Sequence, residues 1–522
     1  MKMLFDSFKS KSIVFICFCI FICKLFALIF LSNFHFIGDN RIVGDADGYV
    51  KLAYNYVVNG HYYISGFQDD MVGYVIRMPG MAIILVPLLT FFSISQAVKL
   101  FVIIQIIIQS IAFGILFKYL NKLVNNRFIL FSVFLFLSLG SYLDEFNSFV
   151  LSETIGSSLF IIASIYLLAE EKLRLNAKFI AVCFLITWLI FLRPFFIVFI
   201  PFFVFKIADF SQIKISVALF LKSNKLVYTF SFIFLFFIGL WTYRNYQITN
   251  KIIPYEYSIR TDKSGDLLEC EPMIRDYIVA FGGNRYTLPY DYKTSNYIWF
   301  LPNHVLTVNN FYRPDNKIFP PDLFNDKFTI DSLISIRSLI DSVYESPINS
   351  EKRKQFFDLF KLKMDVANKT LASNTNFFYK FKARKRAILC LLYQPVQSKK
   401  FVNNNIINMF IIVLNSIMNV FFITVMIFIS FLQFIKRKNF INYYYIYLPA
   451  FFMFLLFSII ICSSESRCLF TFYPAFLIVG LNVFKNITNQ YNVFKIIKIG
   501  SISAFILLLA AYGVYINFVV MN

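Results

Sequence analysis

The chain has 522 residues, of which 58% are hydrophobic and only 15% charged, and its mean hydropathy is +0.66. A water-soluble domain of this size does not carry so apolar a composition, so a soluble class is excluded and lipid is the expected solvent. The formal charge of +21 is typical of basic cytoplasmic loops beside anionic membrane lipids, so no nucleic-acid partner is predicted.

The apolar runs predict an all-α polytopic membrane protein with about 11 transmembrane helices, in a range of roughly 10 to 13. The first run, from Ile13 to Phe34, follows Lys2, Lys9 and Lys11 and is too long for a signal-peptide core, so it is predicted to be a retained helix with its N-terminus inside. The other spans are expected at residues 98–117, 128–142, 154–169, 177–192, 195–205, 227–243, 406–434, 444–462, 470–483 and 494–519. This assignment places every short Lys- and Arg-rich loop on the cytoplasmic side, as the positive-inside rule requires.

The first outer loop is predicted to cover residues 35–97 within an N-terminal membrane region, 1–243. Asp45 and Asp47 precede apolar residues at helical spacing, which indicates a surface helix that the two acids would cap. The run from Met78 to Phe92 is short for a span and contains Pro79 and Pro87. It is therefore predicted to lie along the outer interface or to dip into it.

A second outer segment, residues 244–404, is predicted to be a small, mainly helical extracytoplasmic domain. Its second half, 331–392, carries apolar residues at helical spacing, whereas its first half contains turn signals. Near its end, Lys380, Lys382, Arg384, Lys385 and Arg386 precede an apolar run, a pattern typical of a basic amphipathic helix at the interface. Residues 405–522 complete the chain as a C-terminal membrane region.

Under this topology several charged residues at helix ends converge on the outer face. Ionisable groups at the edge of the hydrocarbon are costly and tend to mark functional sites or ion pathways. This set consists of Asp45, Asp47, Glu153, Arg193, Arg244, Glu465 and Arg467.

The acids in this set suggest general-base chemistry. Asp45 is favoured as the catalytic residue, either as a base on an acceptor hydroxyl or as a group that orients an acceptor phosphate, because its loop abuts a lipid-embedded region. Helix capping is the structural alternative. Asp47 and Glu153 are possible second acids, and Glu153 and Glu465 have the alternative of pairing with the arginines.

The cations suggest phosphate binding. Displacement of a sugar from a lipid phosphate leaves an anion, and the guanidinium fork binds phosphate in a bidentate manner. Arg193, Arg244 and Arg467 are therefore predicted to hold the phosphate of a lipid carrier, with Arg384 and Lys385 of the amphipathic helix as further donor-binding candidates. For each arginine, a snorkelling anchor at the interface is the alternative. Lys24 lies in the middle of the first span and is expected to face other helices.

No metal site or cofactor is predicted. The three histidines, His35, His61 and His304, are scattered, and most of the eight cysteines lie in apolar runs without paired spacing. A divalent metal held by carboxylates is left open.

Four blocks in order carry a resemblance to a known family. They are GDADGYVKLA with RMPGMAIILVPLL, LSETIGSSLF, ITWLIFLRPFFIVFIP and WTYRNYQITNKIIP, followed by a weaker SESRCLFTFYPAFLI. This ordered set resembles the GT-C membrane glycosyltransferases, in particular the branch of the protein O-mannosyltransferases and the bacterial aminoarabinose transferases. The segment 244–404 has no counterpart in the resemblance.

The resemblance implies an inverting glycosyltransferase that uses a polyprenyl-phosphate-linked sugar at the outer (periplasmic) face of a bacterial inner membrane, with Asp45 as the catalytic acid of the first outer loop. The acceptor is left open among lipid, glycan and protein. Some members carry adjacent Asp-Glu acids, whereas here Ala46 follows Asp45 and the second acid is Asp47, so a role for a second carboxylate does not carry over.

Two other classes remain as alternatives. A polysaccharide polymerase or ligase of the O-antigen type would place key arginines and a histidine in the large outer loop, which gives weight to His304 and Arg384. A multi-span transporter or flippase would show paired repeats and charges near mid-membrane, and only Lys24 is clearly central.

Overall fold

The fold is known from a computed structural model of the whole chain. The residues that the structure describes are 13–26, 28–29, 45–64, 70–123, 127–140, 146–170, 173–208, 224–255, 270, 273, 277, 325–347, 350–374, 444–455 and 473–490.

The described part of the chain is mostly helical and forms no β-strand, which confirms the all-α membrane class. Three of its helices are long and apolar enough to cross a bilayer: α6 (Ile94–Leu123), α9 (Ser152–Ala169) and α13 (Lys225–Thr249). Five shorter apolar helices lie at Ile13–Phe26, Ala82–Phe91, Leu130–Leu139, Ala177–Leu192 and Pro194–Ile207. Three spans do not match the predicted count of about 11, and the expected spans at 406–434 and 494–519 lie outside the described residues.

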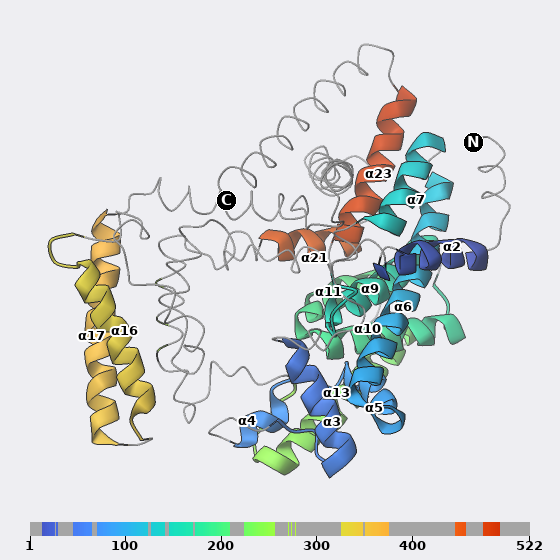
Figure 1. Cartoon of the computed structure of the whole chain (residues 1–522). Helices are drawn as coiled ribbons and strands as arrows, with labels where there is room; N and C mark the ends of the chain where they lie inside the picture. Colours follow the sequence, from blue (N-terminus) through green and yellow to red (C-terminus); the bar gives the residue numbers. More distant parts are fainter. Residues whose placement is uncertain are drawn as a thin grey trace, which may run out of the picture.

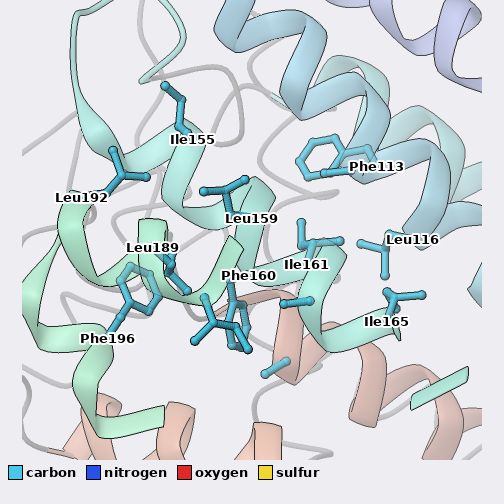
Figure 2. Close-up of a cluster of buried hydrophobic side chains, with 14 of the residues drawn as sticks. Phe113, Leu116, Ile155, Leu159, Phe160, Ile161, Ile165, Leu189, Leu192 and Phe196 are labelled. Atoms are coloured by element: carbon cyan, nitrogen blue, oxygen red, sulfur yellow. The ribbon is translucent and has the colours of Figure 1, made fainter. Parts of the chain in front are cut away.

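The centre of the bundle is formed by α6 and α9, which pack along each other (Figure 1). Helix α2 (Ile13–Phe26) and helix α7 (Arg127–Leu139) pack against α6, and α10 (Ala177–Leu192) packs against α9. Figure 2 shows the apolar core at this junction, where side chains of α9 such as Leu159 and Phe160 lie between Phe113 of α6 and Leu189 of α10. Helix α9 is buried because it is surrounded by these neighbours.

Helix α10 has the predicted limits, and local chemistry explains both ends. The Asn176 side chain accepts a hydrogen bond from the Phe179 backbone N–H at 2.9 Å and caps the N-terminus. At the other end Arg193 is extended (φ −150°, ψ 109°) because Pro194 follows it and disfavours a helical conformation there. The chain then continues as the 3-10 turn η3 (Pro194–Val198) and α11 (Phe199–Ile207).

The segment predicted to be the first outer loop, which keeps that name below, contains three helices in its described residues: α3 (Asp45–Asn59), α4 (Asp70–Val75) and α5 (Ala82–Phe91). The surface helix predicted after the two acids is confirmed as α3, and the short apolar helix predicted between Met78 and Phe92 is confirmed as α5. Helix α4 was not predicted. Helix α5 packs against α3 on one side and against α6 on another.

Helix α13 extends beyond its predicted end at Tyr243 and crosses the predicted domain boundary between residues 243 and 244. It continues to Thr249 because Asn245 and Thr249 make hydrogen bonds that close its last turn, to the carbonyls of Ile253 and Asn245 at 2.8 Å each. Asn250 then ends the helix in the left-handed region (φ 53°), a common helix C-terminus.

The helices predicted in the segment 331–392 are confirmed as far as residue 374 by α16 (Ile330–Glu345) and α17 (Glu351–Asn374). They pack on each other around a core of their own that includes Leu333, Ile340 and Phe360. The C-terminal region contributes α21 (Tyr444–Leu455) and α23 (Tyr473–Gln490). These two helices pack together, α21 also against α11 and α23 also against α6 and α9.

Candidate functional site

The first outer loop docks onto the C-terminal ends of α10 and α13. Gly80 donates its backbone N–H to the Phe191 carbonyl at 3.2 Å and accepts a hydrogen bond from the Trp188 indole at 2.9 Å. A Cβ at Gly80 would overlap the backbone of Phe191 and Leu192, so this close approach requires glycine.

An apolar cluster seals the same junction. Buried side chains from the first loop, from α10 and from α13 meet in it, namely Leu52, Tyr62, Met78, Phe191, Ile238 and Trp241. Beside it, burial raises the pKa of the Tyr255 phenol above its ordinary value. The ends of α10 and α13 and the first loop therefore form one assembly.

Asp45 is the first residue of α3, a position consistent with a capping role as well as a catalytic one. Asp47 forms an ion pair with Lys51 one turn along the helix, at 2.6 Å between Oδ2 and Nζ, and both side chains are exposed. An exposed pair of this kind is weak. Asp47 is therefore engaged at the surface of α3, whereas its proposed role as a second acid stays a prediction.

Arg77 was not among the predicted site residues, yet it lies against Tyr49 of α3. Its guanidinium carbon is 5.5 Å from the centre of the Tyr49 ring, and Tyr49 follows Asp45 by one helical turn. Arg77 precedes Met78, Pro79 and Gly80 in the sequence, and the docking of Gly80 on α10 fixes the backbone just after it. The structure thus adds a cation to the part of the first loop that contains the predicted catalytic acid.

Glu153 and Arg193 form a buried ion pair between the start of α9 and the end of α10. Arg193 Nη2 lies 2.5 Å from Glu153 Oε1, and Arg193 Nε donates to the Ser152 hydroxyl at 2.5 Å. The Glu153 side chain is 3% exposed and that of Arg193 is 18% exposed. The alternative in which Glu153 pairs with an arginine is therefore confirmed. The second oxygen, Glu153 Oε2, is buried and has no hydrogen-bond partner among the described residues.

Arg244 fastens the first outer loop to α13. Its Nη1 donates to the Tyr74 carbonyl at 2.6 Å and to Asn245 Oδ1 at 2.9 Å, and its Nη2 donates to the Tyr62 carbonyl at 2.9 Å. The guanidinium also lies 4.8 Å from the Trp241 ring and 5.9 Å from the rings of Tyr62 and Tyr74. Because these contacts occupy the fork that would bind a phosphate, Arg244 is a clamp in this structure.

Lys24 is buried as expected, with its ammonium 5.0 Å from the Phe113 ring of α6. The remaining predicted site residues, Arg467, Arg384, Lys385 and Glu465, lie outside the described residues, as does His304. Within the described ranges no group of three or more His, Cys, Asp or Glu side chains is arranged to hold a metal ion.

The assembly offers two kinds of chemistry at one end of the bundle. Helix α3 carries the Asp47 carboxylate, Arg77 lies against Tyr49 of the same helix, and the Glu153–Arg193 pair adds a guanidinium whose charge is balanced by its partner. A cation that is fixed in place stabilises a developing phosphate charge without reorganisation, and a nearby carboxylate takes up a hydroxyl proton.

Comparison with known proteins adds no relative: the chain matches no protein-family model, no curated protein and no solved structure.

Proposed function

We propose that this protein is an inverting glycosyltransferase that transfers a sugar from a polyprenyl-phosphate donor to an acceptor at the outer face of the membrane. The observation that carries the proposal is the docking of the acid-bearing first loop on the ends of α10 and α13 through Gly80, Trp188 and Arg244. Asp45 serves as the catalytic base, and Arg77 binds the phosphate of the donor. Arg193, whose Nε and Nη2 are held by Ser152 and Glu153, binds the same phosphate when it exchanges its Ser152 contact.

The reaction requires a base on one side of the anomeric carbon and a phosphate-binding group on the other. Attack by the acceptor hydroxyl transfers its proton to Asp45, and the bond from the anomeric carbon to the phosphate oxygen breaks with its electrons on the phosphate. Arginine stabilises the phosphate charge that develops. The acceptor is a lipid, a glycan or a protein.

The proposal includes the finer topology. It places about 11 spans in a bacterial inner membrane with the N-terminus inside, and it puts both the first loop and the domain from 244 to 404 on the outer side. The charge of the short connections supports this arrangement, because Lys118 and Lys122 lie in the last turns of α6, at the end away from the first loop, and Arg127 begins α7.

The direct test is Asp45→Asn in membranes supplied with undecaprenyl-phosphate-linked sugars. Loss of a general base costs about 100-fold or more, so we expect transfer to fall by that factor while the amount of protein in the membrane is unchanged. Asp47→Asn is expected to change transfer by less than about threefold, because its partner Lys51 is an exposed surface group.

The outcome decides between the proposed enzyme and its rivals. Full activity of Asp45→Asn, with loss of activity on Arg384→Ala, would favour a polysaccharide polymerase or ligase. A loss in Asp47→Asn equal to that in Asp45→Asn would give the second acid a role in the reaction.

Transport is a second candidate function, and one observation favours it. Lys24 and Glu153 are buried among apolar helices, and ionisable groups inside a membrane protein often line ion or substrate pathways. A transporter would move its substrate across sealed vesicles without cleaving a sugar–phosphate bond. Release of free polyprenyl phosphate during the reaction distinguishes the transferase from it.

A further inference from the structure

A network of buried amides connects α6 to the segment that leads into α9. Gln105 Nε2 donates to the carbonyl of Asn147 at 2.5 Å and to that of Phe149 at 3.0 Å, with the Phe146 carbonyl at 3.5 Å. Asn147 Nδ2 donates to Gln109 Oε1 at 2.8 Å, and Thr154 donates its hydroxyl to Asn147 Oδ1 at 3.0 Å. All four of these side chains are buried.

The orientation of these amides follows from their partners. Carbonyl oxygens only accept hydrogen bonds, so the Gln105 group that faces the carbonyls of 146–149 must be its NH₂. Residues 146–151 are not helical. The segment makes two backbone hydrogen bonds of its own, from the Phe149 N–H to the Phe146 carbonyl at 3.3 Å and from the Leu151 N–H to the Phe149 carbonyl at 3.0 Å. Gln105 adds a donor from α6 to these two carbonyls and to that of Asn147, so it ties the segment to α6.

The network lies at membrane depth. The 30 residues of α6 make a helix about 45 Å long, and Gln105 lies about 16 Å from its first residue along the axis. A hydrocarbon layer about 30 Å thick that lies within this length always includes the central third of the helix, whichever end of the helix it lies nearer to. Because Gln105 lies in that middle part, the backbone that it binds is at the same depth, where irregular backbone persists only if protein groups satisfy it.

The Glu153–Arg193 pair is attached to this network. Thr154, which bonds Asn147, is adjacent to Glu153, and Arg193 contacts both Ser152 and Glu153. The hydrogen bonds from α6 therefore determine where α9 begins and at what depth the ion pair lies.

We propose that Gln105, with Gln109, Asn147 and Thr154, is a positioning device that seats the start of α9 inside the membrane and thereby holds Arg193 in place for the donor phosphate. The positioning of the start of α9 is inferred from the hydrogen bonds alone. Only the role of Arg193 in binding the donor phosphate rests on the proposed function. Gln105 acts through Glu153 and Arg193 and is a positioning residue.

The test compares Gln105→Met with Ser110→Ala in the full chain in lipid nanodiscs. Methionine keeps the volume of glutamine but donates no hydrogen bond. Ser110 is a matched control because it is a buried polar residue of the same helix whose hydroxyl bonds only its own turn, the Ile106 carbonyl at 2.7 Å. We expect hydrogen exchange of the 146–151 amides to rise about tenfold or more in Gln105→Met, and to stay within about twofold in Ser110→Ala. If hydrogen exchange of the 146–151 amides rises by the same small factor in both variants, Gln105 does not position the start of α9.

A second arm measures transfer from undecaprenyl-phosphate sugars in the wild type and in an Arg193→Lys background. Positioning through Arg193 predicts that Gln105→Met reduces transfer strongly in the wild type and by less than about twofold when Arg193 is already replaced. The same loss in both backgrounds would show a general structural effect and overturn the link. If the wild type releases no polyprenyl phosphate, the proposed function fails, and the exchange arm still decides the seating.

Discussion

Replacement of Arg193 by methionine is expected to lower the free energy of unfolding by about 3 kcal/mol, because it leaves the Glu153 carboxylate buried without its counter-charge. Glu153 is 3% exposed and its Oε1 accepts from Arg193 at 2.5 Å. Solvent therefore cannot replace the lost partner. Reversible unfolding in mixed detergent micelles measures the effect.

The double variant Glu153→Leu with Arg193→Met distinguishes the cost of losing the ion pair from the cost of leaving one buried charge without a partner. It removes both charges and keeps similar volumes, so we expect it to be within about 1 kcal/mol of the wild type. A double variant that loses as much as the two single variants together would contradict the buried pair, as would a loss below about 1 kcal/mol in Arg193→Met alone.

Arg244→Lys is expected to loosen the first outer loop although it keeps the positive charge. Lysine has no planar fork, so it cannot donate to the Tyr62 and Tyr74 carbonyls at the same time. Loss of hydrogen bonds from a charged donor costs about 2 kcal/mol, which corresponds to a roughly 30-fold faster hydrogen exchange of segments 61–64 and 73–78.

Tyr243→Phe is the matched control for the clamp, because Tyr243 neighbours Arg244 on the same helix and is 64% exposed. In Tyr243→Phe, amide hydrogen exchange of the first loop should equal that of the wild type. If Arg244 were instead a phosphate ligand, Arg244→Lys would raise the KM for the donor and leave the exchange of the loop unchanged.

Much of the fold can be predicted from the apolar runs and from the residues that start and stop helices. The limits of α10 were predicted to the residue, because Asn176 and Arg193–Pro194 carry local start and stop signals. Helices α6 and α13 extend beyond the predicted spans 98–117 and 227–243, because the charges of Lys118 and Arg244 indicate loops in the sequence. Helices that emerge from a membrane keep their backbone hydrogen bonds in the polar region, so charge marks the interface rather than the helix end.

The site was less accessible to sequence reasoning. Asp45, Glu153 and Arg193 stand out as charges beside apolar runs, but that pattern does not tell which of them pair. Arg77 and the amides Gln105 and Asn147 were missed because their partners lie far along the chain, and a single polar residue in an apolar run does not change its periodicity. The signal available in retrospect is the occurrence of Gln105 and Gln109 one turn apart on a helix that is otherwise apolar there.

The central claim is that the first loop, docked on the ends of α10 and α13, belongs to the outer side of the membrane. A topology reporter inserted after Gly60, the end of α3, tests it most directly, because Gly60 has a positive φ of 71° and open space around it. The account predicts activity of a reporter that works only outside the cytoplasm. A reporter active only in the cytoplasm would contradict the assignment of the loop, and the proposed transferase with it.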